Sequence, residues 1–182
     1  MYKRQAITVG ILSDTHGFLD PRIAETVNQC DYIIHAGDIM GAHVLRALEP
    51  GLQLHAVAGN NDNAMVWDDD EADVVNSLPS KLKLNLPGGL LIIEHGHRLG
   101  NNPEHDKLRW DHAEARLVIY GHTHKRVIDT SESPWVVNPG AAGKVRTKGG
   151  PSCLLLNASE SDWHIKEIVF PDSDINRRDQ AA

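Results

Sequence analysis

Side chains that bind metal ions recur in this sequence directly after apolar runs. Each occurrence alone is a weak signal, because a short turn with an aspartate or a histidine is common by chance. Together they form a repeated pattern, in which five apolar runs are each followed by carboxylate, imidazole or amide groups. The seven candidate ligands are Asp14, His16, Asp38, Asn60, His95, His122 and His124.

The residue types indicate which ions such a site would hold. Carboxylate and amide oxygens with imidazole nitrogens, and no cysteine, suit manganese, iron, nickel or zinc better than calcium. Seven ligands are too many for one tetrahedral zinc, so two ions fit better. Ligands two residues apart in an extended chain point the same way and can serve adjacent ions. We expect Asp38, on the central loop, to bridge two divalent ions, manganese first, with nickel, iron or zinc as alternatives.

The charge of this predicted centre favours an anionic substrate. Two divalent ions carry a charge of +4 and the carboxylates of Asp14 and Asp38 contribute −2, so the centre has a net charge of about +2. A bridging hydroxide, formed from a water whose pKa the ions lower, would attack phosphorus in line. We therefore expect a metal-dependent phosphoric ester hydrolase whose substrate is a small phosphate ester.

The first third of the chain has the elements needed to position these groups. Strand patterns over 6–12, 31–35 and 52–58 alternate with helix patterns over 22–29 and 42–48, which predicts a βαβαβ unit with parallel strands. In open α/β sheets, ligands bind outside the carboxyl ends of the strands. We expect the loops that carry the candidate ligands to meet at one edge of one predicted sheet.

The remaining patterns complete a single domain over residues 1–170. A hairpin is expected around Pro87-Gly88-Gly89, with strands over 81–86 and 90–94, and a helix over 103–115 before a strand over 117–120. Further strands are expected over 126–130, 135–138, 152–157 and 163–170. The acidic stretch 67–76 is interpreted as a solvated helix or loop, and 171–182 as a disordered tail.

Composition narrows the classes of partner. The 182 residues carry a net charge of −7, which lacks the basic footprint of a nucleic-acid binder. No apolar run approaches the roughly 20 residues of a membrane span, and we expect a cytoplasmic protein that does not bind membranes. Cys30 and Cys153 are expected to be reduced core thiols. The sequence leaves open whether the chain forms a homo-oligomer.

The motifs in their order resemble those of a known superfamily. "SDTHG", "HAGD", "GNND", "EHGH" and "GHTHK", followed by "NPGAAG", resemble the calcineurin-like metallophosphoesterases, and the short length is similar to the small prokaryotic YfcE-like phosphodiesterase branch. The resemblance implies a four-layer α/β/β/α sandwich of two mixed β-sheets. It also implies that Asp14, His16, Asp38 and His124 hold one ion, and Asp38, Asn60, His95 and His122 the other.

One departure from the superfamily bears on the substrate. Many members have a histidine at the position of Asn61, where it is assigned as the general acid for the leaving oxygen. An amide does not titrate near neutral pH, so esters with poor leaving groups should react slowly here. We predict that diesterase activity exceeds monoesterase activity.

Other polar residues have weaker assignments. Asn60, Asn61, Asp62 and His97 are candidates for orienting ligands or contacting substrate, whereas His35 is interpreted as structural. The cations Lys144, Arg146 and Lys148 alternate along the chain, so they form either one face near the site or, as we favour, a solvated basic turn. Two alternatives stay open. One is a metal-poor protein-interaction scaffold of the same fold, as in a eukaryotic retromer subunit, and the other is a nuclease, which the acidic charge disfavours.

Overall fold

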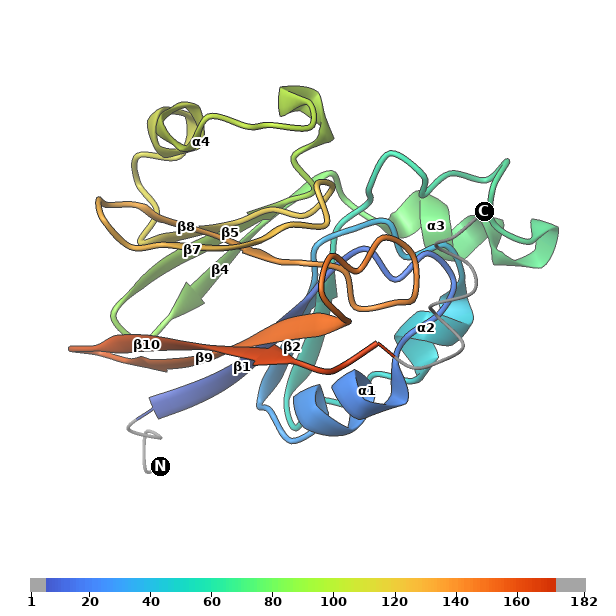
Figure 1. The fold of residues 1–182 in the computed structure, drawn as a ribbon, viewed down its shortest axis with the longest axis horizontal. Coiled ribbons are helices and arrows are strands. Elements are labelled where there is room, and N and C mark those ends of the chain that lie inside the picture. The colour runs from blue at the N-terminus through green and yellow to red at the C-terminus, as the bar shows by residue number, and fades with distance from the viewer. Residues whose placement is uncertain (1–5, 173–182) are drawn as a thin grey trace.

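The computed structural model describes residues 6–172 and contains two five-stranded sheets (Figure 1). The first sheet has the order β10-β9-β1-β2-β3. Its strands are β1 (Ala6–Leu12), β2 (Tyr32–His35), β3 (Gln53–Ala56), β9 (Ser152–Ser159) and β10 (Trp163–Val169). The second sheet has the order β4-β5-β6-β8-β7. Its strands are β4 (Lys81–Leu86), β5 (Gly89–Glu94), β6 (Leu117–Ile119), β7 (Arg126–Asp129) and β8 (Trp135–Pro139).

The predicted βαβαβ unit is confirmed. Strands β1, β2 and β3 pair in parallel, and the helices α1 (Pro21–Val27) and α2 (Ala42–Arg46) connect them. Helix α1 begins as the sequence indicates, because the Asp20 side chain accepts a hydrogen bond from the Arg22 amide and Pro21 occupies the first turn. The predicted hairpin also forms, with β4 antiparallel to β5.

The expectation that all five ligand loops meet at the edge of one sheet is wrong. Strands β1, β2 and β3 lie in the first sheet, whereas β5 and β6 lie in the second. The periodicity of a strand reports whether its faces are buried but not which sheet it joins. The two mixed sheets agree instead with the four-layer sandwich that the motif resemblance implies.

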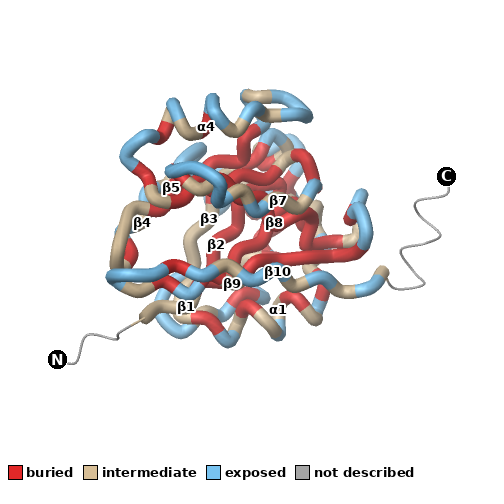
Figure 2. The backbone as a smooth tube through the Cα atoms, turned by 60° about the vertical axis from the view of Figure 1, so that its left-hand side comes forward, coloured by how far each residue is buried: buried red, intermediate tan, exposed pale blue. Residues whose placement is uncertain are grey.

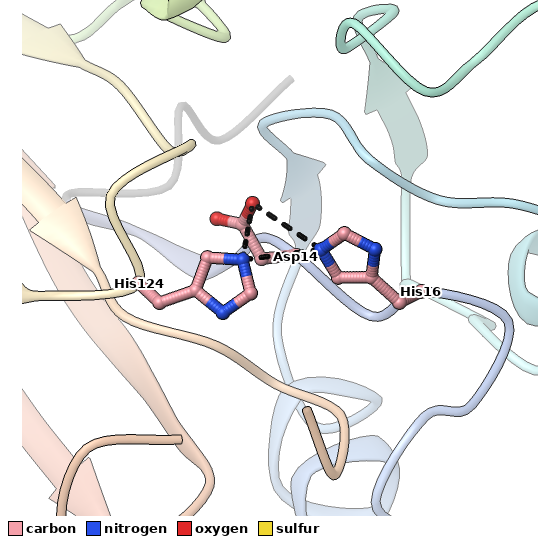
Figure 3. Close-up of side chains that lie close together, drawn as sticks. All are labelled: Asp14, His16 and His124. Carbon is pink, nitrogen blue, oxygen red and sulfur yellow. Dashed lines mark hydrogen bonds and ion pairs between the residues drawn. The ribbon is translucent and has the colours of Figure 1, made fainter. Parts of the chain in front are cut away.

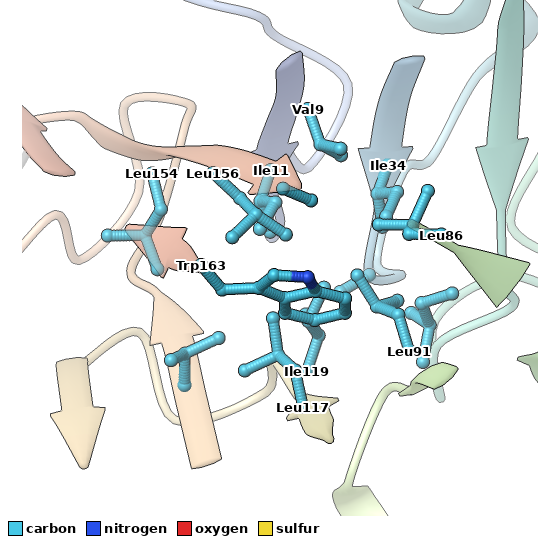
Figure 4. Close-up of a cluster of buried hydrophobic side chains, with 14 of the residues drawn as sticks. Val9, Ile11, Ile34, Leu86, Leu91, Leu117, Ile119, Leu154, Leu156 and Trp163 are labelled. Carbon is cyan, nitrogen blue, oxygen red and sulfur yellow. The ribbon is translucent and has the colours of Figure 1, made fainter. Parts of the chain in front are cut away.

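The main core lies between the two sheets and follows the two-residue alternation of the strands. Val9 and Ile11 of β1 face Leu91 of β5 and Ile119 of β6, and the Trp163 side chain lies among them (Figure 4). The intervening residues point outward to the helices. Burial is accordingly concentrated along the central strands (Figure 2).

Helices cover the outer face of each sheet. Ile23 and Val27 of α1 pack on Leu12 and Ile33 of the first sheet. Leu108 of α4 (His105–Asp111) packs with Ile92, Val118 and Val136, which point outward from the second sheet. These contacts make four layers in the order α/β/β/α. Helix α4 is shorter than the 103–115 range that we expected.

The acidic stretch is less solvated than its composition suggests. It contains the 3-10 helix η1 (Asp69–Glu71) and the start of α3 (Ala72–Ser77), and it buries the Trp67 ring against Ile39 and Val44. The carboxylate of Glu71 accepts a hydrogen bond from the Ala42 amide at 3.0 Å. This segment therefore packs against the second ligand loop.

Three remaining expectations concern the thiols, the tail and the membrane. Cys30 and Cys153 are buried free thiols, as predicted. The expected disordered tail lies outside the described residues except for 171 and 172. Within residues 6–172, no helix has the length and apolar character needed to cross a membrane.

Candidate metal centre

The five candidate loops converge although they come from two sheets. The loops after β1 and β2 are joined by hydrogen bonds from the Asp14 amide to the Gly37 carbonyl and from the His16 amide to the Asp38 carbonyl, both at 3.0 Å. The loop after β6 joins them, since the His122 amide donates to Asp14 Oδ2 at 3.0 Å. The convergence that the motifs predict therefore occurs between sheets.

The backbone is strained at these loops. Eight non-glycine residues within 6–172 have positive φ angles, and five of them are candidate ligands. These five are Asp14, His16, Asp38, His122 and His124. Such conformations cost roughly 1–3 kcal/mol each and cluster at functional sites, where surrounding contacts impose them.

The first group of ligand atoms comes from Asp14, His16 and His124 (Figure 3). The Nε2 atoms of His16 and His124 are 3.1 Å apart, and His124 Nε2 is 3.4 Å from Asp14 Oδ1. His16 Nε2 also lies 3.7 Å from Asp38 Oδ2. Asp38 is thus positioned between this group and the next.

The second group comes from Asp38, His95 and His122. His95 Nε2 lies 3.4 Å from Asp38 Oδ1 and 4.0 Å from Asp14 Oδ1. The amide oxygen of Asn60 is 3.0 Å from His122 Nδ1, which adds Asn60 to this group. All seven predicted ligands therefore lie together.

The donor atoms fit divalent cations. Two ligands about 2.1 Å from one ion are roughly 3.0–3.4 Å apart. The His16–His124, His124–Asp14 and His95–Asp38 separations of 3.1–3.4 Å fall in this range, whereas His16 Nε2 is 4.0 Å from Asp14 Oδ1. Asp14 Oδ1 and His95 Nε2 are buried without any hydrogen-bond partner in the described structure. Buried polar atoms are normally paired, so these two atoms fit a site that is completed by a bound cation.

The protein fixes which nitrogen of two histidines faces the centre. His95 Nδ1 donates to the Ala36 carbonyl at 2.7 Å, and His124 Nδ1 donates to the Val145 carbonyl at 2.9 Å. Because a carbonyl only accepts, the proton of each neutral ring stays on Nδ1. The lone pairs on Nε2 then point into the centre, as metal ligation requires.

Burial and charge perturb the ionisation of the cluster in the absence of cations. Burial raises the pKa of Asp14 to about 7. Burial, and after it the positive charge of Arg146, lowers the pKa of His124 to about 4. Burial and then neighbouring charges, including Arg146, also lower the pKa of His16 and of His122. These histidines are therefore held neutral and able to ligate.

Two glycines allow the loops to approach one another. A Cβ atom on Gly59 would lie 2.2 Å from Asp38 Oδ1, and one on Gly121 would lie 2.1 Å from Ser13 Oγ. No larger residue fits at either position without displacing these groups. The glycine of "GNND" therefore leaves room for the Asp38 carboxylate.

Asp62 orients the loops through their backbone. Its buried carboxylate accepts hydrogen bonds from the amides of Ile39, Met40 and Gly59 at 2.8–3.1 Å, and from Trp67 Nε1 at 3.0 Å. These contacts occupy both carboxylate oxygens. Of the two roles that the sequence left open for Asp62, ligand orientation agrees with this geometry.

Asn61 and His97 both lie beside the second group. The Asn61 amide nitrogen Nδ2 donates to Asp38 Oδ2 at 2.8 Å, and its backbone amide donates to Asp38 Oδ1 at 2.9 Å. The exposed His97 ring has its centroid 5.6 Å from that of His95. His35 is fully buried and contacts Thr15 Oγ1 at 2.9 Å, in agreement with a structural role.

The "NPGAAG" motif supports the last histidine loop. Asn138 is fully buried, and its Nδ2 donates to the Gly121 carbonyl at 2.7 Å and to Thr123 Oγ1 at 3.2 Å. Its Oδ1 accepts from the Gly140 amide at 2.9 Å. The motif therefore positions the loop with His122 and His124 from a neighbouring strand.

One residue at the centre, Met40, was not identified from sequence, and a second, Arg146, was placed by preference in a solvated turn. Met40 Sδ lies 3.2 Å from His16 Nδ1, and Arg146 Nη2 lies 3.2 Å from His124 Nε2. Our interpretation of Arg146 as part of a solvated basic turn therefore does not describe its guanidinium. The spacing of residues in the sequence could not predict this contact, because residue 146 lies in an irregular loop.

Sequence comparison relates this arrangement to known proteins. A family model for the calcineurin-like phosphoesterase superfamily domain matches residues 7–161. The phosphodiesterase MJ0936 of Methanocaldococcus jannaschii is 28% identical over 177 residues, covering 89% of this chain and 98% of the relative. A probable metallophosphoesterase of Mycoplasma pneumoniae is 30% identical over 170 residues, covering 88% and 94% respectively.

Structural comparison finds the same fold in solved structures. The crystal structure of Vps29 from Entamoeba histolytica aligns with a TM-score of 0.71 over 90% of this chain and 99% of that chain, at 16% identity. At this identity the likeness shows a common fold alone.

Proposed function

Because this chain belongs to the calcineurin-like phosphoesterase superfamily, we propose that it is a metal-dependent phosphodiesterase that hydrolyses small phosphate esters. The observation that carries the proposal is the pair of three-residue groups, each with ligand atoms within 4.8 Å of one another. Membership of the family implies divalent metal ions. The relatives named as a phosphodiesterase and a probable metallophosphoesterase support the same reaction class.

The proposed first ion is held by Asp14, His16, Asp38 and His124. The proposed second ion is held by Asp38, Asn60, His95 and His122. The mixed oxygen and nitrogen donors favour manganese, with nickel, iron or zinc as alternatives. When bound, divalent ions supply positive charge to the phosphoryl group and a nucleophilic water at neutral pH.

The protein holds several of the candidate ligands in buried positions that hydrogen bonds fix. Backbone carbonyls hold the protons of His95 and His124 away from the centre, so the rings need no reorientation to bind cations. Asp62 keeps the loops of Asp38 and Asn60 in register through backbone amides. The substrate therefore meets donors whose positions are already fixed.

Asn61 supports a preference for diesters with good leaving groups. Its amide contacts the Asp38 carboxylate, at the side where many superfamily members carry a histidine acid. Without a proton donor there, hydrolysis of poor leaving groups loses roughly 100- to 10,000-fold. Activated diesters depend less on protonation.

The experiment is a substrate panel with metal analysis. Protein reconstituted with manganese is expected to hold about two ions per chain by elemental analysis and to hydrolyse bis(p-nitrophenyl) phosphate faster than p-nitrophenyl phosphate. Cyclic nucleotides complete the panel. A faster monoester reaction would overturn the diesterase preference, and fewer than one ion per chain would favour the scaffold.

The alternative functions have weaker support. The resemblance to Vps29 concerns the fold alone, and all seven candidate donors are present in this chain. A nuclease function is disfavoured, because the net charge of −7 on the protein repels a long polyanionic substrate.

A further inference from the structure

Arg146 places a guanidinium at the edge of the candidate metal centre. Its Nη2 atom is 3.2 Å from His124 Nε2, the nitrogen whose lone pair points into the centre. It comes from the loop between β8 and β9, whereas all seven candidate ligands come from the other five loops. Arg146 is therefore a cation at the centre that takes no part in ligation.

The loop that carries Arg146 is fixed on both sides of it. The carbonyl of Val145 accepts the hydrogen bond from His124 Nδ1 at 2.9 Å. Thr147 is fully buried, and its Oγ1 donates to Asp172 Oδ1 at 2.8 Å. Arg146 itself has a φ angle of 51°, in the region shared by five candidate ligands. The strained backbone is thus held by specific contacts, as at the ligands themselves.

Among the arginines of residues 6–172, Arg146 and Arg116 are the two for which no ion pair with a carboxylate is seen. Five arginines in residues 6–172 form ion pairs, namely Arg22, Arg46, Arg98, Arg109 and Arg126. Arg116 donates to the Gly88 carbonyl and lies over the Trp163 ring. Within residues 6–172, Arg146 makes a hydrogen bond to His124 in place of an ion pair.

That hydrogen bond competes with ligation. A nitrogen lone pair given to a cation is no longer available to the guanidinium, so Arg146 loses its acceptor once His124 ligates. The planar fork of an arginine then matches the non-bridging oxygens of a phosphate group, which a metal-bound substrate brings to this edge. The geometry provides an anion-binding group beside the Asp14–His16–His124 side of the centre.

We propose that Arg146 binds a non-bridging oxygen of the substrate phosphate and so orients it at the centre. This inference rests on the proposed phosphoesterase function. It assigns to Arg146 a direct contact with the substrate phosphate. Because the contact is made to the charged group common to all phosphate esters, it acts on diesters and monoesters alike.

The test compares Arg146→Ala and Arg146→Lys with Lys144→Ala. Lys144→Ala is a matched control, because it removes the same charge from the same loop. The Lys144 Nζ atom lies over the Phe18 ring and not at a candidate ligand. For each manganese-loaded protein, calorimetry measures the affinity for inorganic phosphate, elemental analysis measures metal content, and kinetics give kcat and KM.

Arg146→Ala is expected to bind phosphate at least tenfold more weakly and to lose roughly 10- to 100-fold in kcat/KM, the worth of one charge-assisted hydrogen bond. Its metal content should equal that of the wild type. Guanidinium ion added to Arg146→Ala should restore part of the lost activity. It should restore no activity to a variant in which a candidate ligand is replaced. Arg146→Lys should lie between wild type and Arg146→Ala.

Two results would overturn the proposal. Phosphate affinity in Arg146→Ala equal to that of Lys144→Ala would mean that the guanidinium does not contact phosphate. Loss of metal from Arg146→Ala would mean that Arg146 only supports His124. A wild-type protein that hydrolyses no phosphate ester would instead remove the proposed function, and phosphate calorimetry would still decide the role of Arg146.

Discussion

The Nε2 atoms of His16 and His124 face each other at 3.1 Å although 108 positions separate the residues in the chain. The His124 ring carries its proton on Nδ1, where the Val145 carbonyl accepts it, so its Nε2 presents a lone pair. Asp14 Oδ1 lies 3.4 Å from the same nitrogen. Donor atoms this close together can share a divalent cation, which agrees with the proposed metal centre.

Metal binding should stabilise the folded chain, because only the folded state brings the donors together. With manganese at about 100 times its dissociation constant, the stabilisation is about 2.7 kcal/mol, or roughly 5–10 °C in Tm. Differential scanning calorimetry with and without chelator measures this shift. His124→Ala should lose most of it, whereas exposed His164→Ala should retain it. An equal shift in both variants would contradict the assignment of His124 as a ligand.

Replacement of Asp62 by asparagine should weaken metal binding without removing a ligand. The new amide group cannot accept from all of the Ile39, Met40 and Gly59 amides, so the two ligand loops lose their common anchor. We expect a loss of about 2–4 kcal/mol in the free energy of unfolding and 10- to 100-fold in metal affinity. Metal titration and urea denaturation measure the two effects.

Trp67→Phe is the matched control for Asp62→Asn. It removes one hydrogen bond to the same carboxylate and keeps an aromatic ring in the pocket. A cost near 1 kcal/mol with nearly normal metal affinity is expected. If Asp62→Asn bound metal as tightly as Trp67→Phe, Asp62 would have no orienting role.

A histidine at position 61 should shift the substrate preference. Asn61→His introduces a group able to donate a proton to a leaving oxygen, and general acids contribute roughly 100- to 10,000-fold when well placed. The ratio of monoester to diester hydrolysis should rise at least tenfold. Asn61→Gln, which keeps the amide, should leave the ratio unchanged, and a rise in both variants would point to a cause other than acid catalysis.

The Asp129 ion pairs should make stability depend on acid pH. Hydrogen bonds from Ser131, His105 and Arg109 lower the pKa of Asp129 below its ordinary value. A carboxylate with a depressed folded-state pKa contributes stability that is present above about pH 4 and is lost as pH falls through the folded-state value. Asp129 is partly solvated, which limits this contribution to about 1 kcal/mol.

Asp129→Asn tests this contribution by urea denaturation at several pH values. The difference from wild type should be largest at pH 5–7 and shrink below about pH 4. Asp106→Asn is the control, because Asp106 is bound to the same Arg109 but has a side chain 89% exposed. A difference for Asp129→Asn that grew as the pH fell would contradict the assigned direction of the pKa change.

The sequence by itself determined the local elements and the identity of the donors. Asp20-Pro21 predicted the start of α1, and the apolar run over 6–12 predicted β1. The positions after the strands predicted all seven candidate ligands. Such features depend on near neighbours in the chain, through capping, periodicity and turn preference, and are therefore readable without the fold.

The tertiary structure decided which strands share a sheet and what surrounds the donors. The sequence led us to expect one sheet, but the loops come from two, because pairing between distant strands leaves no mark in their periodicity. The hydrogen bonds from the Ile39 and Met40 amides to Asp62 and the approach of Arg146 to His124 likewise depend on contacts 22 or more residues apart. Long-range packing alone brings these groups to the donors, so only the folded chain distinguishes a residue of a solvated turn from one that faces the metal centre.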